Sequence, residues 1–160
     1  MKLLLAALLI VPTAANAADC TLQSAIYRQT ESKYELRFTP VPAEFAGGPF
    51  SNAFTLDGGG VHLTGDVRWS SGASRPVAAV GLDCPADPSP EEFEVCNLYE
   101  DVPYALTGER LHHLPPESEA PPDQILFPDL QGTLWYSKLR DIEGITDMPW
   151  DVFQFAACAG

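Results

Sequence analysis

The sequence predicts an all-β protein: a single-domain antiparallel sandwich or barrel of about seven to nine short strands, with little helix and two disulfides. Two segments alternate apolar and polar side chains with a period of two residues, as half-buried strands do. Prolines gather in three clusters between strand-like segments, and proline is excluded from central strands and helix interiors. An even number of cysteines, four, allows complete pairing.

The two clearest strands are Lys33–Thr39 and Val61–Trp69. Alternation places Tyr34, Leu36 and Phe38 on the buried face of the first strand, because successive side chains leave opposite faces. The same alternation divides the second strand into two sets. Its inward set is Val61, Leu63, Val67 and Trp69, and its outward set is His62, Thr64, Asp66 and Arg68.

Weaker apolar runs predict the remaining strands. These are Leu22–Arg28, Ala53–Leu56, Val77–Leu82, Asn97–Thr107, Ile125–Phe127, Thr133–Leu139 and Val152–Ala157. Turn residues separate them at Asp57–Gly60, Ser70–Ser74 and Thr107–Glu109. Pro149–Cys158 fits either a helix or a closing strand, and the alternation of its phenylalanines favours the strand.

The proline clusters predict three surface loops: Pro40–Pro49, Pro85–Pro90 and Pro115–Pro122. Trp69 is expected in the core because it falls on the apolar face of its strand. Core packing is also expected for Trp135, Tyr136 and Trp150, with stacking on a sugar ring or a peptide as the alternative.

Residues 1–17 read as a cleavable signal peptide, which leaves residues 18–160 as one disulfide-stapled domain. The apolar core Leu3–Val11 is much shorter than the roughly 20 residues of a membrane span. Ala15-Asn16-Ala17 supplies the small residues that signal peptidase requires. Cys20 follows three residues later rather than directly after the cleavage point, which disfavours a lipid anchor. We therefore expect release into the bacterial periplasm, or alternatively into the medium.

The cysteines predict the disulfides Cys84–Cys96 and Cys20–Cys158. Three pairings are possible. The first pair flanks a short proline-rich acidic loop, and the second lies at the two ends of the mature domain, which are often close together. Zinc sites bring cysteines in closer pairs, and the redox spacing C-x-x-C does not occur.

The charge of the chain is strongly negative. Without the leader, 22 acidic residues face 8 basic ones, giving a net charge of −14. Such a surface repels phosphate backbones and anionic lipids, so we expect no nucleic-acid partner. Basic partners, cations and neutral ligands stay open. We expect an unidentified protein or small ligand as partner and no cofactor, and the sequence does not indicate an oligomeric state.

The three histidines are the candidates for a metal site or for acid–base chemistry. His112 and His113 are adjacent and would point to opposite faces of a strand, which disfavours joint coordination of a metal. Glu109, Glu117 and Glu119 lie nearby in the sequence and could complete a metal site in a loop. His62 shares the outer face of its strand with Thr64 and Asp66. The acids between 83 and 94 follow no known calcium-loop spacing.

Three classes of function remain. We favour a non-enzymatic binding or accessory domain that uses its proline-rich loops. The first alternative is an exported hydrolase of glycans or peptides, in which Asp66 or Glu109 would lie beside a histidine; no G-x-S-x-G nucleophile elbow is present. The second alternative is a periplasmic metal or calcium-binding protein that uses His112 and His113.

Overall fold

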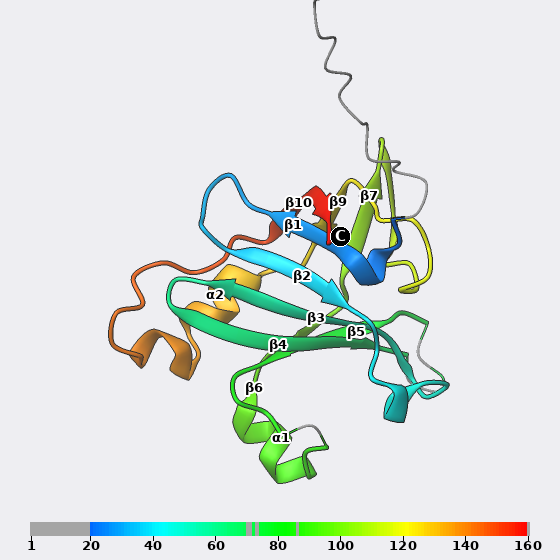
Figure 1. The fold of residues 1–160 in the computed structure, drawn as a ribbon. Coiled ribbons are helices and arrows are strands. Elements are labelled where there is room, and N and C mark those ends of the chain that lie inside the picture. The colour runs from blue at the N-terminus through cyan, green and yellow to red at the C-terminus, as the bar shows by residue number, and fades with distance from the viewer. Residues whose placement is uncertain (1–19, 70–71, 73, 86, 160) are drawn as a thin grey trace, which may run out of the picture.

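The computed structural model describes residues 20–69, 72, 74–85 and 87–159. Within these residues ten strands form one antiparallel sheet of order β6-β5-β4-β3-β2-β1-β10-β9-β7-β8 (Figure 1). The strands are β1 (Ala25–Arg28), β2 (Glu35–Thr39), β3 (Phe50–Gly58), β4 (Val61–Arg68), β5 (Val77–Gly81), β6 (Asn97–Asp101), β7 (Tyr104–Thr107), β8 (Arg110–His113), β9 (Gln124–Leu126) and β10 (Val152–Cys158). The predicted all-β class is confirmed, with one strand more than the expected range.

Two α-helices and three short 3-10 helices are present among the described residues, one of them before β1 and the others between strands. They are α1 (Pro90–Cys96), α2 (Leu130–Trp135), η2 (Leu22–Ser24), η3 (Ala43–Phe45) and η4 (Lys138–Asp141). The strand predicted at Thr133–Leu139 is wrong, because α2 and η4 occupy that segment. The short strand β8 was not predicted, since its four residues carry no clear alternation of apolar and polar side chains. None of the described helices has the length and apolar character to span a membrane.

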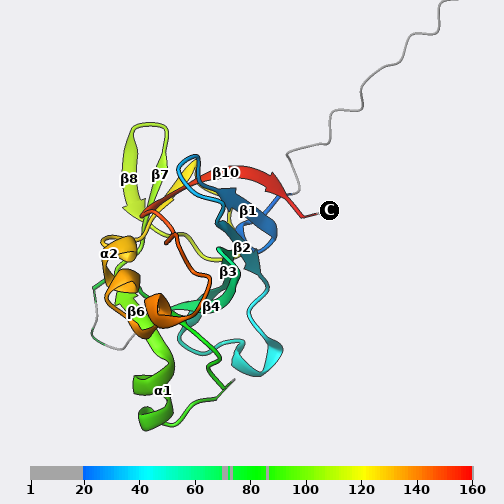
Figure 2. The ribbon, with the colours of Figure 1, turned by 90° about the vertical axis from the view of Figure 1, so that its left-hand side faces the viewer.

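The sheet curls until its two ends approach each other (Figure 2). β6 forms one edge and β7 lies beside the opposite edge, yet Val102 and Pro103 alone separate them in the chain. The Tyr99 ring of β6 meets the Phe127 ring, which follows β9, with centroids 6.2 Å apart. The described strands therefore form a single curled, barrel-like sheet and not a sandwich of two sheets.

The inner face of the curl holds the core. The predicted alternation is confirmed in β2, where Leu36 and Phe38 are buried, and in β4, where Leu63 and Val67 are buried. The prediction that Trp69 belongs to this core is wrong. β4 ends at Arg68, so Trp69 lies beyond the strand with 39% of its surface exposed.

Glycine shapes the hairpin between β3 and β4. Gly59 and Gly60 both adopt positive φ, 57° and 88°, as the two central residues of a type I′ turn do. A side chain at Gly59 would also meet the Tyr34 hydroxyl, 2.6 Å from the added Cβ. The predicted Asp57–Gly60 turn is thus confirmed, and Gly108 marks the predicted turn between β7 and β8. The turn predicted at Ser70–Ser74 lies mostly outside the described residues.

Three buried tyrosines fasten the irregular segments to the sheet. Each hydroxyl donates to a backbone carbonyl more than 25 residues away in the chain, so the phenol reaches its partner across the core. The bonds are Tyr27 to Pro122 at 2.9 Å, Tyr34 to Asp147 at 3.0 Å and Tyr99 to Pro128 at 3.1 Å. Loops that lack strand pairing are held by these contacts.

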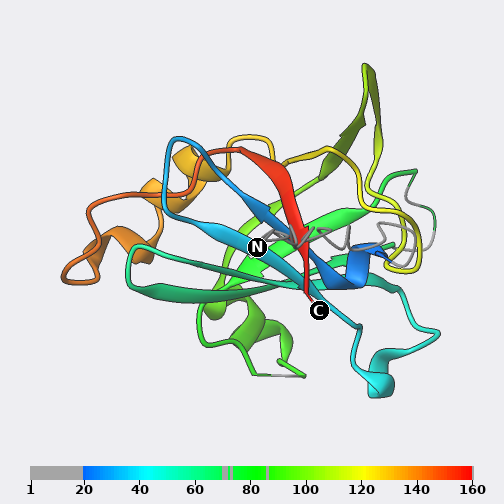
Figure 3. The ribbon, with the colours of Figure 1, turned by 45° about the horizontal axis from the view of Figure 1, so that its top comes forward.

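Both predicted disulfides are confirmed. Cys20–Cys158 joins residues 138 positions apart beside the β1–β10 pair, close to the C-terminal end seen in Figure 3. Cys84–Cys96 joins residues 12 positions apart around the segment that contains α1. The expected signal peptide, residues 1–17, lies outside the described residues.

The two disulfides are expected to stabilise the fold unequally. Loop-closure entropy predicts a loss of about 5 kcal/mol for Cys20→Ser with Cys158→Ser, and about 3 kcal/mol for Cys84→Ser with Cys96→Ser. Urea unfolding of both double variants measures the difference. A larger loss from the short loop would contradict the prediction.

Stability should also fall as the pH rises above about 10, the pKa of an unperturbed tyrosine. Burial raises the pKa of Tyr27 above its usual range, and Asp123 adds to the rise; burial likewise raises the pKa of Tyr34 and Tyr99. Because the unfolded chain loses these protons first, their contribution is complete below pH 10 and is lost above it. Unfolding of wild type and Tyr27→Phe between pH 8 and about 11 tests this, and parallel pH profiles for the two proteins would contradict it.

Candidate functional site

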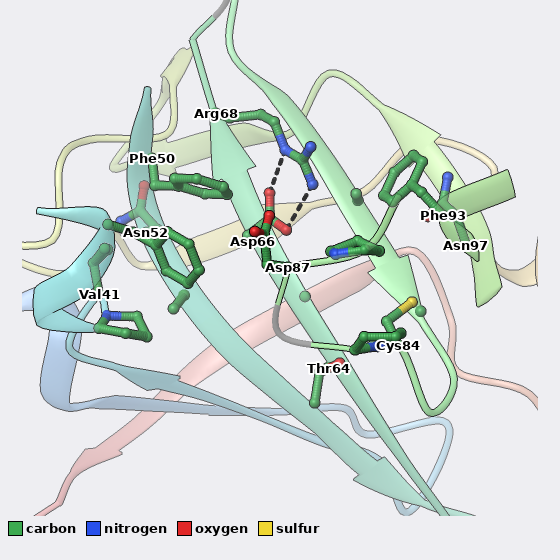
Figure 4. A pocket seen from close by; sticks show the side chains of 18 of the residues that line it. Val41, Phe50, Asn52, Thr64, Asp66, Arg68, Cys84, Asp87, Phe93 and Asn97 are labelled. Carbon is green, nitrogen blue, oxygen red and sulfur yellow. Dashed lines mark hydrogen bonds and ion pairs between the residues drawn. The ribbon is translucent and has the colours of Figure 1, made fainter. Parts of the chain in front are cut away.

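A groove of about 790 Å³ lies over the outer face of β3, β4 and β5. We call this cavity the outer groove (Figure 4). Its first wall is residues 41–50, between β2 and β3. Its second wall is residues 84, 85 and 87–93, between β5 and β6. The walls contain most of two of the predicted proline-rich loops, Pro40–Pro49 and Pro85–Pro90, which therefore lie across the same stretch of sheet.

Small side chains form the floor of the outer groove. In the strand register, Asp66 of β4 stands between Ala53 of β3 and Ala79 of β5. In the next row, Thr64 stands opposite Gly81. Directly opposed residues lie close together across a sheet, so these short side chains leave open space above the strands.

The first wall carries two phenylalanines, and hydrogen bonds of Glu117 hold it in place. The Phe45 and Phe50 rings pack at a tilt, with centroids 5.1 Å apart. The Val41 N–H donates to a carboxylate oxygen of Glu117 at 2.7 Å, and the Glu117 N–H donates to the Ser51 carbonyl at 3.2 Å. Glu117, a metal-ligand candidate from the sequence, thus supports the wall through the third proline-rich loop.

The second wall is built on α1, which begins with a capping box. The Glu92 N–H donates to the Ser89 hydroxyl at 3.3 Å, and the Glu92 carboxylate accepts from the Ser89 N–H at 2.9 Å. The hydrogen bond from the Ser89 N–H to the carboxylate lowers the pKa of Glu92, and the Ser89 side chain adds to this effect. Pro90 occupies the first turn, where its missing N–H costs nothing. This helix was not predicted, although Ser89-Pro-Glu-Glu92 carries the capping-box signal.

The Cys84–Cys96 disulfide fastens the second wall to the sheet. A Cβ added at Gly81 would collide with Cys84 Sγ, so the sulfur packs directly against the glycine backbone of β5. The Leu82 N–H donates to the Cys96 carbonyl at 3.0 Å at the base of the same segment. The cysteine pair and the missing side chain at residue 81 together bring the wall close to the strand.

Arg68 connects the floor with both walls. Its Nε and Nη2 donate to the two carboxylate oxygens of Asp66, at 2.6 and 2.8 Å. Its Cζ lies 5.2 Å from the ring centroids of both Phe50 and Phe93, and Figure 4 shows the guanidinium between them. A guanidinium is favourable in such surroundings, because carboxylates and aromatic faces both attract cations.

The predicted histidine candidates lie elsewhere. His62 is exposed on β4 and pairs with Asp57, with Nδ1 2.5 Å from Oδ1. His112 contacts the Thr107 hydroxyl at 3.0 Å, and the His113 ring packs near Trp69. None of the three lines the outer groove. Over the described part of the chain, no three His, Cys, Asp or Glu side chains gather where they could hold a metal ion.

The acids and aromatics proposed from the sequence are also dispersed. Asp66 lies on the groove floor, whereas Glu109 is exposed in the β7–β8 turn. The expected core packing of Trp135, Tyr136 and Trp150 is wrong, since they are 46%, 82% and 44% exposed. Trp135 instead receives the Arg140 guanidinium over its ring, at 5.8 Å. The groove phenylalanines Phe45, Phe50 and Phe93 were not predicted, because no periodic pattern in the sequence marks the side chains that line the two walls.

No protein-family model, curated protein or solved structure matches the chain.

Loss of the Cys84–Cys96 disulfide should loosen the second wall and leave the sheet intact. In the Cys84→Ser, Cys96→Ser variant, amides of residues 87–96 should exchange with deuterium at least about tenfold faster, since their local opening no longer has to break the cross-link. Hydrogen-exchange mass spectrometry measures this, with Cys20→Ser, Cys158→Ser as the matched control. Unchanged exchange in this segment would show that other contacts hold the wall.

Proposed function

We propose that the protein is an exported, non-enzymatic binding protein that holds a small organic ligand in the outer groove. The observation that carries this proposal is the construction of the groove itself. The two walls, which contain most of two proline-rich loops, present phenylalanine side chains across a floor that includes alanine and glycine. Its volume of about 790 Å³ falls within the roughly 300–1,000 Å³ range of small-ligand sites.

The polar contacts of the groove support binding rather than hydrolysis. Both oxygens of Asp66 accept hydrogen bonds from Arg68, and the cysteine in the lining is held in a disulfide. Among the described residues, a histidine–carboxylate pair that resembles the expected hydrolase arrangement is His62 with Asp57, and it is exposed outside the groove. A catalytic base needs hydrogen-bond reach to its substrate, and this pair does not line the space where the outer groove would hold one.

The disulfides support export. Cysteine pairs form and persist in oxidising compartments such as the bacterial periplasm, and both pairs are formed here. Together with the leader-like residues 1–17, they favour a periplasmic location, with the external medium as the alternative. The second wall depends on one of these disulfides, so the proposed binding site suits an oxidising environment.

Blocking the floor should abolish binding. Ala53→Trp places an indole in the groove, whereas His62→Trp adds the same group to the outer face of β4 outside it. Suitable probes are naphthyl-ethylammonium, naphthyl-ethanol and naphthyl-acetate, which share one apolar body and differ in charge. We expect at least one probe to shift the amide NMR signals of groove residues in wild type and His62→Trp, and to leave Ala53→Trp unaffected.

Two results would contradict the proposed function. The first is that none of the three probes perturbs groove residues. The second is that the perturbations persist in Ala53→Trp, provided that the spectrum of that variant shows the native fold. Either result would place binding elsewhere or remove it.

A further inference from the structure

The rim of the outer groove carries two carboxylates without a compensating charge. Glu44 lies on the first wall and Asp87 on the second, both exposed. Within the described residues, neither makes an ion pair. The lining as a whole holds three carboxylates and one guanidinium. Because Arg68 is engaged by Asp66, an incoming ligand meets an excess of negative charge.

The interior of the groove already accommodates a cation. The guanidinium of Arg68 lies between the Phe50 and Phe93 rings and against the Asp66 carboxylate. Each carboxylate oxygen can accept about two hydrogen bonds, and Arg68 supplies one to each. Lone pairs of Asp66 are therefore free to accept from a second positive group that enters beside Arg68, in a space lined by Phe45, Phe50 and Phe93.

The charge of the whole chain acts in the same direction. The sequence carries 22 acidic residues against nine basic ones, a net charge of −13. The summed field of such a surface concentrates cations and repels anions at low ionic strength. Among the described lining residues Arg68 supplies the one positive charge for an anionic ligand. Such a ligand would have to compete there with a carboxylate bound through two hydrogen bonds.

We propose that the outer groove selects organic cations. Such a ligand combines an apolar body, which packs against Phe45, Phe50 and Phe93, with an ammonium or guanidinium group. Its positive group faces the three carboxylates of the lining, Glu44, Asp66 and Asp87. This inference rests on the proposed binding function and adds the chemical class of the ligand.

The three naphthyl probes test the selectivity directly. Titration followed by NMR should give a dissociation constant for naphthyl-ethylammonium about fivefold or more below that of naphthyl-ethanol, a ratio expected when ring faces and carboxylates both attract the charge. Naphthyl-acetate should bind most weakly. Raising the ionic strength should reduce the preference for the cation, because salt screens exposed charges.

Charge-neutral variants of the rim identify the groups responsible. Glu44→Gln with Asp87→Asn should reduce the preference for the cation to about twofold or less and leave the neutral probe unchanged. Glu109→Gln with Glu143→Gln is the matched control, since it changes the net charge equally at exposed residues that do not line the groove. An equal reduction of the cation preference in both double variants would show that Glu44 and Asp87 are not the groups responsible.

Arg68→Met tests whether the guanidinium competes with a cationic ligand for Asp66 or instead binds an anionic ligand. Removing it leaves Asp66 free, so cation affinity should rise about threefold or more. A fall in cation affinity in Arg68→Met would overturn the proposal. So would strong binding of naphthyl-acetate to wild type that is lost in this variant while the affinities of the other two probes stay unchanged. Groove binding of the neutral probe as tight as that of the cation overturns the selectivity alone. Failure of all three probes to enter the groove instead overturns the proposed function.

Discussion

The disulfide Cys84–Cys96, packed against the bare backbone of Gly81, is the constraint on which the outer groove depends. It holds the second wall against the sheet, where the wall has no strand pairing of its own. That position brings the Phe93 ring to the guanidinium of Arg68. Through Arg68 the same contact reaches Phe50 on the first wall, which the hydrogen bond from Val41 to Glu117 holds separately.

The curl of the sheet explains why this face is open. Because only Val102 and Pro103 join β6 to β7, the sheet curls and its two ends approach each other. Most of its large aromatic side chains are buried on the inner face of this curl. Tyr27, Tyr34 and Tyr99 then bind the loops that cover the core. The outer face of β3–β5 keeps small residues, and two loops pass across it without filling it.

The sequence predicted the parts whose signals are local. Alternation identified β2 and β4, glycines identified the β3–β4 turn, and the placement of the cysteines at loop and chain ends identified both disulfides. The outer groove could not be predicted, because it depends on strand register: Ala53 and Ala79 flank Asp66 only after three strands pair. The proline clusters were expected as surface loops, but nothing in their composition shows that two of them oppose each other. The prediction of Trp69 as a core residue was wrong because β4 ends at the preceding residue, Arg68.

We expect the space between these two walls to be a ligand site for cations. A crystal structure of the protein with bound naphthyl-ethylammonium would locate the site. We expect the naphthyl body between the two walls, with the ammonium group within hydrogen-bond distance of Glu44, Asp66 or Asp87. A probe found only at the exposed aromatics Trp135, Tyr136 or Trp150, with the outer groove empty, would contradict it.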